Sequence, residues 1–176
     1  ILHAWQGDAA LATQGNFNND IGLPLTLLRL RPVHRAAVVE LGMNHLGEIA
    51  YLSGIAQPTV ALVNNAQREH QEFMSSVEAV AHENGAVLSA LKVDGVAVFP
   101  ADDEHENIWR DLSDKRRQLL FSEHSVRADV ATQSADWQDD HWRVSARTPA
   151  GVVAFTLHIA GRHNLRNALA ATACAV

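Results

Sequence analysis

The chain has few of the residues that mark several classes of protein. Its 176 residues include a single cysteine, Cys174, so a scaffold held by disulfides within the chain is excluded. No apolar run approaches the roughly 18 residues that cross a bilayer, and the N-terminal residues lack a basic segment before an apolar stretch. From these absences we expect a cytoplasmic protein without a membrane span.

Positive charge is also scarce. The 14 basic side chains are outnumbered by 20 acidic ones, which gives a net charge of −6. Broad nucleic-acid binding needs a basic face, so we expect small-molecule partners and no nucleic acid. Lys92 and Lys115 are the two lysines, and neither follows a glycine, so the chain lacks the Gly-Lys-Ser/Thr loop that cradles phosphates.

The remaining composition is that of a folded domain, with 47% hydrophobic and 19% charged residues. Short apolar runs alternate with helical patterns along the first two thirds of the chain. Strands are expected over 36–41, 59–63 and 95–99, and helices over 21–30, 47–56 and 75–91. This alternation predicts an α/β fold with a mostly parallel central sheet flanked by helices.

The C-terminal third has a different pattern. Short β-rich runs follow one another with turn-like polar residues between them, and an alanine-rich helix closes the chain. Strands are expected over 118–121, 125–132, 141–146 and 152–159. We interpret these runs as a smaller antiparallel portion of the sheet.

Three polar clusters each follow a short β-rich run: residues 13–20 come after a first short strand, residues 40–45 end the strand expected over 36–41, and residues 64–70 follow the strand expected over 59–63. Ligands of α/β proteins gather beyond the carboxyl ends of the strands, so these clusters are candidate binding loops. The first cluster is rich in asparagine and precedes a helix. Its amides could bind a polar ligand, or they could simply cap that helix.

Glu40 and His70 are candidate metal ligands. Glu40 ends an otherwise apolar strand, where an unpaired carboxylate would be costly to bury, and Mg²⁺ is a natural partner for such an oxygen. His70 ends the polar loop after the next strand, and in a parallel sheet the two side chains could share one ligand. Each could instead make an ordinary hydrogen bond at a strand end.

Three further asparagines stand out in helices. Asn84 falls on the apolar stripe of the helix expected over 75–91, where an amide needs a partner, whereas His82 lies off that stripe and is expected in solvent. Asn164 and Asn167 lie three apart at the start of the last helix. Both could contact one planar ligand, or one could cap the helix. Cys174, in the same alanine-rich helix, is expected to be inert.

Taken together, four segments in order resemble the Mur ligases: 13–28, 40–49, Asn64-Asn65 with His70, and 161–170. The asparagine-rich segment most resembles members that add D-alanyl-D-alanine to UDP-N-acetylmuramoyl-tripeptide in peptidoglycan synthesis. The resemblance implies that residues 1–176 are part of a central ATP-binding domain without its first strand and phosphate loop. The flanking UDP-sugar-binding and C-terminal domains would lie outside this chain, which alone would be inactive, and the complete protein would be monomeric.

The resemblance also assigns roles. Glu40 and His70 would hold Mg²⁺, and Asn164 and Asn167 would contact the adenine side of ATP. The muramoyl-peptide side would be lined by Thr13, Asn16, Asn18, Asn19, Asn44 and His45. ATP would phosphorylate the substrate carboxylate, and the amine of D-alanyl-D-alanine would attack the acyl phosphate.

One position departs from the family. Many Mur ligases carry a carbamylated lysine fourteen residues after the metal histidine, where this chain has Asn84. We expect Asn84 to serve the site through a hydrogen bond or a metal-bound water. Two other functions stay open: a non-catalytic ligase-like domain that binds a nucleotide or partner, and a related amide ligase such as folylpolyglutamate synthase.

Overall fold

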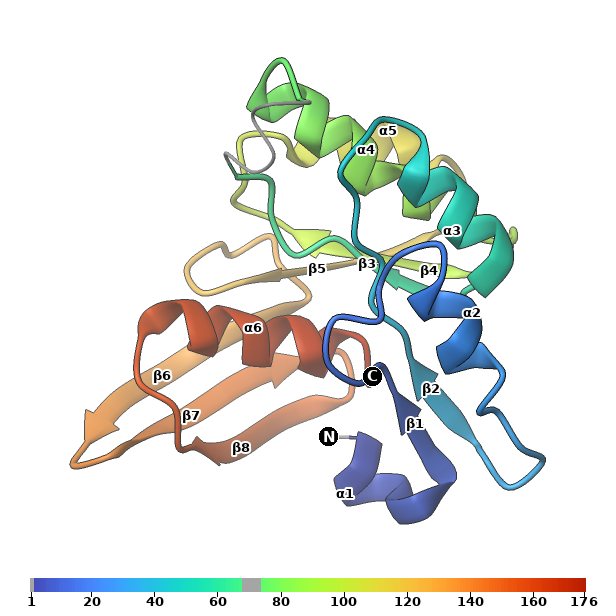
Figure 1. Cartoon of the computed structure of the whole chain (residues 1–176). Helices are drawn as coiled ribbons and strands as arrows, with labels where there is room; N and C mark the ends of the chain where they lie inside the picture. The colour runs from blue at the N-terminus through green and yellow to red at the C-terminus, as the bar shows by residue number, and fades with distance from the viewer. Residues whose placement is uncertain (1, 68–73) are drawn as a thin grey trace.

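The computed structural model describes the backbone of residues 2–67 and 74–176. Within these ranges the strands form two separate sheets, one of two strands and one of six (Figure 1). The fold is the expected mixture of α and β structure, with a mostly parallel sheet flanked by helices.

The two-stranded sheet is built from the N-terminal part of the chain. Helix α1 (Leu2–Gln6) and a 3₁₀ turn (Gly7–Ala9) lead into β1 (Ala10–Ala12), which pairs in parallel with β2 (Ala36–Val38). Helix α2 (Gly22–Leu27) lies between the two strands in the sequence.

The six-stranded sheet has the order β3-β4-β5-β6-β7-β8. Its first four strands run parallel to one another, and β7 and β8 continue the sheet in antiparallel pairing. The strands are β3 (Val60–Leu62), β4 (Val96–Pro100), β5 (Arg117–Ser122), β6 (Val130–Gln138), β7 (His141–Thr148) and β8 (Gly151–Leu157).

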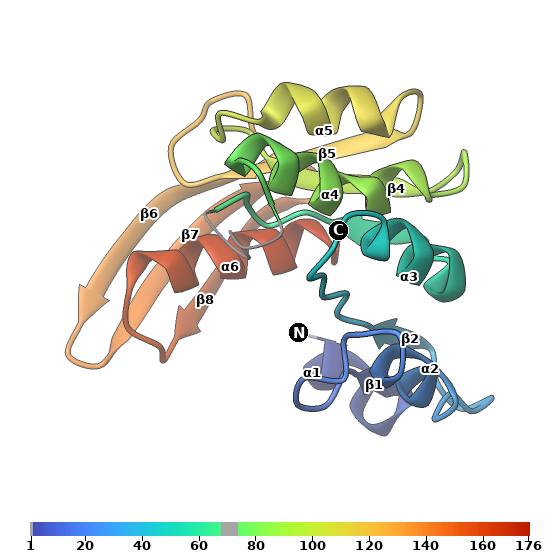
Figure 2. The same cartoon turned by 45° about the horizontal axis from the view of Figure 1, so that its top comes forward.

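Helices cover both faces of this larger sheet (Figure 2). Helices α3 (Glu48–Ala56), α4 (Val77–Ser89) and α5 (Glu106–Ser113) lie on one face, and α6 (Arg162–Ala173) lies on the other. None of the helices in the described ranges is long and apolar enough to cross a membrane.

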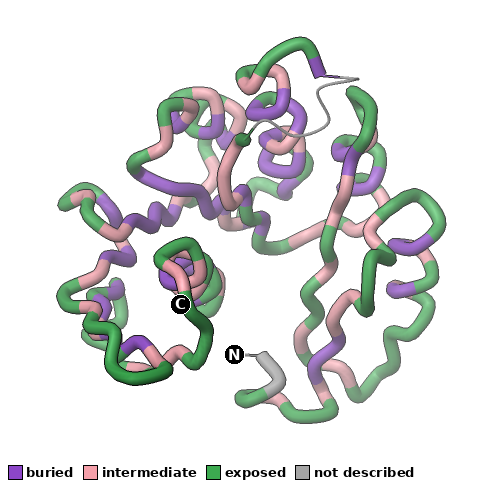
Figure 3. The backbone as a smooth tube through the Cα atoms, turned by 60° about the vertical axis from the view of Figure 1, so that its left-hand side comes forward, coloured by how far each residue is buried: buried purple, intermediate pink, exposed green. Residues whose placement is uncertain are grey.

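Strand β4 separates the two parts of the core. Phe99 packs in the cluster that contains α4 and α5, while its neighbour Val98 packs against α6 from the opposite face. This alternation is the two-residue period of a strand buried on both sides. Buried residues concentrate in the central strands and on the inner sides of the helices, as the purple segments of Figure 3 show.

Three expectations from the sequence are wrong in detail. The antiparallel portion begins only at β7, because β5 pairs in parallel with β4 and β6 in parallel with β5. Helix α5 connects β4 to β5, and such a crossover returns the chain in the same direction. Strand β6 also runs well beyond the expected end at residue 132, and β2 ends at Val38 rather than 41.

Candidate functional site

Three of the expected site residues converge at the carboxyl ends of β1 and β2. The Thr13 hydroxyl accepts a hydrogen bond from the backbone N–H of Glu40 at 2.9 Å. The Asn18 side-chain amide donates to Oε1 of Glu40 at 2.8 Å. Because β1 and β2 are parallel, their carboxyl ends meet at one edge, and this brings the first two polar clusters together.

Gly42 allows this close approach. Its backbone N–H donates to the Asn18 carbonyl at 2.8 Å, and a Cβ at position 42 would lie 2.6 Å from Nδ2 of Asn18. A side chain there would push the amide of Asn18 away from Glu40. We did not single out Gly42 from the sequence; its place two residues after Glu40 in a polar loop was the available signal.

Glu40 itself is exposed and lies in the loop beyond β2. Solvent and the Asn18 amide therefore satisfy its carboxylate, so burial alone does not require a cation there, and the metal role of Glu40 stays a prediction. Strands β2 and β3 belong to different sheets, so strand pairing does not bring their loops side by side. His70 lies outside the described residues.

Asn19 and Asn16 have simpler surroundings. The Oδ1 of Asn19 accepts from the backbone N–H groups of Ile21 and Gly22, at 3.2 and 2.8 Å, where α2 begins. This is the capping interpretation of the first cluster. Asn16 is exposed, and its carbonyl accepts the backbone N–H of Asn18 at 2.8 Å, which tightens the same loop.

Asn44 and His45 are held by Glu48 in the first turn of α3. One carboxylate oxygen accepts the backbone N–H groups of Asn44 and His45, at 2.6 and 3.1 Å, and the other lies 3.1 Å from Nδ1 of His45. The backbone donors of Asn44 and His45, with a smaller contribution from the His45 ring, hold the pKa of Glu48 below its usual 4.5. Asn44 and His45 are themselves exposed, so both can face a ligand.

Glu83 is a buried acid that sequence reasoning missed. Its side chain, on α4, accepts the backbone N–H groups of Gly47 and Ile49 at the start of α3, both at 2.9 Å. The residue is only 6% exposed. The available signal was its helical face, since Val80 and Val87, three positions before and four after Glu83, are both buried.

The loop after β3 is held from two sides. On one side, Asn84 of α4 donates to the carbonyl of Asn65 at 3.3 Å. On the other side, Asn64 donates to Oδ1 of Asn167, on α6, at 2.8 Å. The structure thus finds a partner for the amide on the apolar stripe, and it brings Asn64 to the last helix.

Asn164 and Asn167 do not share a hydrogen-bond partner. The amide of Asn164 donates to the carbonyl of Ala160 at 2.8 Å and lies 3.1 Å from Nε2 of His163. The helix is capped by Gly161 rather than by an asparagine side chain.

Arg166, another residue we had not singled out, lies between these two asparagines in the sequence. Its Nη2 is 3.5 Å from Asp102 and 3.8 Å from Asp103, which follow β4. Its Nε and Nη2 atoms are buried and make no hydrogen bond within the described part of the chain, and the same holds for Oδ1 of Asn64. Buried polar atoms are normally paired, so a polar ligand at this edge could complete their hydrogen bonds.

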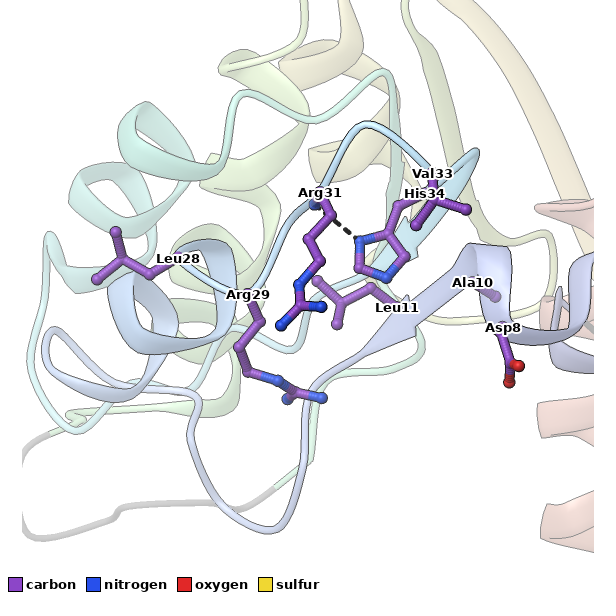
Figure 4. A pocket seen from close by; sticks show the side chains of 8 residues that line it. All are labelled: Asp8, Ala10, Leu11, Leu28, Arg29, Arg31, Val33 and His34. Atoms are coloured by element: carbon purple, nitrogen blue, oxygen red, sulfur yellow. Dashed lines mark hydrogen bonds between the residues drawn. The ribbon is translucent and has the colours of Figure 1, made fainter.

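A separate hollow of about 540 Å³ lies beside the small sheet (Figure 4). Its lining comes from residues next to the amino ends of β1 and β2 and includes Arg29, Arg31 and His34. His34 accepts the backbone N–H of Arg31 at 3.0 Å through Nδ1. The hollow is thus at the edge opposite to Thr13 and Glu40, and it contains none of the expected site residues.

Comparison with known proteins gives a consistent result. The Mur ligase middle domain model matches residues 1–175. The UDP-N-acetylmuramoyl-tripeptide–D-alanyl-D-alanine ligase of Escherichia coli is 40% identical over 93% of this chain, and that of Haemophilus influenzae is 39% identical over 98%. Among solved structures, MurF from Acinetobacter baumannii matches 93% of the chain with a TM-score of 0.87 and 34% identity.

The chain spans little more than a third of these relatives: 36% of the Escherichia coli protein, 37% of the Haemophilus influenzae protein and 36% of the Acinetobacter baumannii chain. MurF from Thermotoga maritima, solved in complex with ADP, shares the fold with a TM-score of 0.79 at 23% identity.

Proposed function

The chain belongs to the Mur ligase middle domain family, and from this premise we propose that its protein is an ATP-dependent ligase of peptidoglycan synthesis. The reaction would join D-alanyl-D-alanine to UDP-N-acetylmuramoyl-tripeptide, as the names of relatives 39–40% identical to the chain indicate. One structural observation carries the proposal: Thr13 and Asn18 both hold Glu40 at the carboxyl edge of β1 and β2.

The chemistry requires positioning and charge stabilisation rather than a protein nucleophile. A carboxylate oxygen of the tripeptide attacks the γ-phosphorus of ATP, and ADP leaves. The amine of D-alanyl-D-alanine then attacks the acyl carbon, the C–N bond forms, phosphate leaves and the amine loses a proton. Fixed polar groups at a sheet edge suit both steps because they need not reorganise during the reaction.

The Glu40 carboxylate, the described donor of the candidate metal site, is the oxygen type of ligand that Mg²⁺ prefers. Glu40 offers an exposed carboxylate whose orientation is fixed by Asn18. Glu40 and His70 would hold the ion, which would offset negative charge on the phosphates when bound. Thr13 and Asn18 would keep the carboxylate in place, and Asn84 would hold the loop after β3 through Asn65.

The nucleotide would lie toward α6. We assign the adenine side of ATP to Asn164 and Asn167. Buried atoms of Asn64 and Arg166 that make no hydrogen bond within the described residues support a polar ligand at this edge. The phosphate-binding Gly-Lys-Ser/Thr loop would come from a part of the protein outside this chain.

The muramoyl-peptide side would use the loops that follow β1 and β2. Its residues would be Thr13, Asn16, Asn18, Asn19, Asn44 and His45. Of these, Asn16, Asn44 and His45 are exposed side chains suited to direct contact. Thr13, Asn18 and Asn19 already make internal hydrogen bonds, so their part would be to shape the loop.

We further infer that residues 1–176 are part of a central domain completed by other segments of the protein. The chain spans about a third of its relatives, and its two parallel ladders are not joined to each other. Apolar residues of their strands stay exposed, namely Val38 at 54% and Val60 and Leu62 at 39% each. A further strand and flanking domains would cover such surface.

The test is phosphate release by the complete protein with Mg·ATP, UDP-N-acetylmuramoyl-tripeptide and D-alanyl-D-alanine, omitting each substrate in turn. Release that needs all three, with the amide product identified by mass spectrometry, is the expected result. Folded protein that binds ATP without releasing phosphate would instead support a non-catalytic domain. Release with a different acid or amine would support a related ligase.

A further inference from the structure

Two histidines and an aspartate gather at one end of the antiparallel part of the sheet, and the chemistry proposed above uses none of them. One ligand atom from each of Asp140, His141 and His158 lies within 4.8 Å of the others. We propose that these three side chains bind a divalent transition-metal ion of the kind that imidazole prefers, such as Zn²⁺.

The backbone sets this arrangement. Trp142 of β7 pairs with Leu157 of β8, so the preceding His141 and the following His158 face each other at the end of the ladder. Their ring centroids are 5.2 Å apart. Asp140 enters from the turn between β6 and β7, where Asp139 adopts a left-handed φ of 51°.

The three groups are also partly organised toward one another. Oδ1 of Asp140 lies 3.0 Å from Nδ1 of His141, whose side chain is only 20% exposed. The hydrogen bond to His141 and, to a smaller extent, the charges of His141 and His158 lower the pKa of Asp140. An aspartate carboxylate is in any case ionised near neutral pH and can act as a ligand.

The donor set selects the class of metal. Two imidazole nitrogens and one carboxylate oxygen suit Zn²⁺, Ni²⁺ or Cu²⁺, whereas Mg²⁺ prefers a ligand set made up mainly of oxygens. A ligand lies about 2 Å from such an ion, so small side-chain rotations would draw the three atoms inward. The bound ion would tie the end of β8, an edge strand of the sheet, to the β6–β7 turn.

The test is calorimetric titration of the complete protein with Zn²⁺ in the presence of excess Mg²⁺, which competes with Zn²⁺ for the proposed catalytic site. We expect one Zn²⁺ equivalent that is weakened at least about tenfold in His141→Ala and in His158→Ala. His82→Ala removes an exposed imidazole on α4 and is the matched control. Identical Zn²⁺ isotherms in the wild type and both histidine variants would overturn the proposal.

A second readout uses Trp142, which adjoins His141 in β7 and packs edge-on against Trp137 with centroids 5.3 Å apart. Cu²⁺ at the site should quench tryptophan fluorescence in the wild type and in His82→Ala, and to a smaller extent in His158→Ala. Equal quenching in all three proteins would contradict the site. Both readouts are independent of ligase activity, so a negative result here would not count against the proposed function, and a failed activity test would not count against the metal site.

Discussion

The Oε2 atom of Glu83 lies 2.9 Å from the backbone nitrogen of Gly47, although 36 positions separate the two residues in the chain. The other oxygen of the same carboxylate accepts the N–H of Ile49 at 2.9 Å. A negative charge at the start of α3 also interacts favourably with the helix dipole. Glu83, which lies on α4, thus fixes the start of α3 and the adjacent segment that carries Asn44 and His45.

Replacing Glu83 should destabilise the fold. Glu83→Ala would leave the buried N–H of Ile49 and the part-buried N–H of Gly47 without their acceptor, so we expect a loss of about 2–4 kcal/mol in the free energy of unfolding. Glu83→Gln keeps one acceptor oxygen and should lose less. Urea denaturation of the complete protein measures both effects.

The control for this prediction is Glu78→Ala, in the first turn of the same helix. Glu78 is exposed, so its loss should cost less than about 1 kcal/mol. If Glu83→Ala were no more destabilising than Glu78→Ala, the two hydrogen bonds would contribute nothing measurable.

Asn84 should matter for catalysis more than for stability. Its single hydrogen bond of 3.3 Å to Asn65 is long, and such a bond contributes about 1 kcal/mol or less. Asn84→Ala should nevertheless lower turnover and raise the Mg²⁺ concentration needed for half-maximal rate, because the loop after β3 loses its hydrogen bond to α4. Asn107→Ala, an exposed asparagine on α5, is the matched control. An unchanged rate and Mg²⁺ dependence in Asn84→Ala would show that this residue does not serve the site.

For Glu40, two variants separate charge from hydrogen bonding. Glu40→Ala removes an exposed side chain, so its effect on stability should stay near 1 kcal/mol, while turnover should fall about a hundredfold or more. Glu40→Gln keeps an acceptor for Asn18 but no charge, and it should lose activity to a similar degree. Glu104→Ala, whose side chain is 83% exposed, controls for loss of surface charge. Full activity in Glu40→Gln would mean that the carboxylate charge has no catalytic role.

Gly42→Ala is predicted to displace the side-chain amide of Asn18. The added Cβ would lie 2.6 Å from the amide nitrogen, so the amide must move away from Glu40. We expect turnover to fall by the same factor as in Asn18→Ala, and the double variant to be no worse than either single one. Gly54→Ala, with nothing within 4 Å of its Cβ in α3, should be neutral or stabilise by up to about 1 kcal/mol. Independent, multiplying losses in the double variant would contradict this link.

The elements that sequence reasoning predicted well are those with strong local periodicity. Strands β3 and β4 and helices α3 and α4 lie within two residues of the expected bounds. The predicted antiparallel direction of β5 was wrong. Hydrophobic alternation identifies a strand, but the direction of its pairing depends on the segment that connects it to its neighbour, here helix α5. The separation of β2 from β3 was equally invisible, since no local signal states which strands share a sheet.

The same division holds for the candidate site. Polar loops after strands could be found from the sequence, and Thr13, Asn18 and Glu40 do meet at such an edge. The residue type of Glu83 did not indicate a buried acceptor, because an acidic side chain in a helix usually faces water. Its role as an acceptor depends on where α3 begins, which is a long-range feature. The placement of Glu40 within a strand was also wrong, since β2 ends at Val38, three residues before its expected end at 41.

Glu48 should give the loop before α3 a pH dependence. Its pKa is lowered in the folded protein, chiefly by the backbone N–H groups of Asn44 and His45, so the unfolded chain takes up its proton more readily. The stabilising contribution is therefore complete above the usual pKa of 4.5 and is lost as the pH falls through the lower folded value. Unfolding free energies of the wild type and Glu48→Gln, measured between about pH 7 and about pH 3, test this.

The gap between these two proteins should be largest at neutral pH and should close in acid, because protonation removes from the wild type the same charge that glutamine lacks. The side chain is 41% exposed, so added salt should also narrow the gap at neutral pH. A difference that is constant across the whole range would mean that Glu48 acts through packing alone. In that case the hydrogen bonds from Gly47 and Ile49 to Glu83 would be the remaining electrostatic restraint on the loop that carries Asn44 and His45.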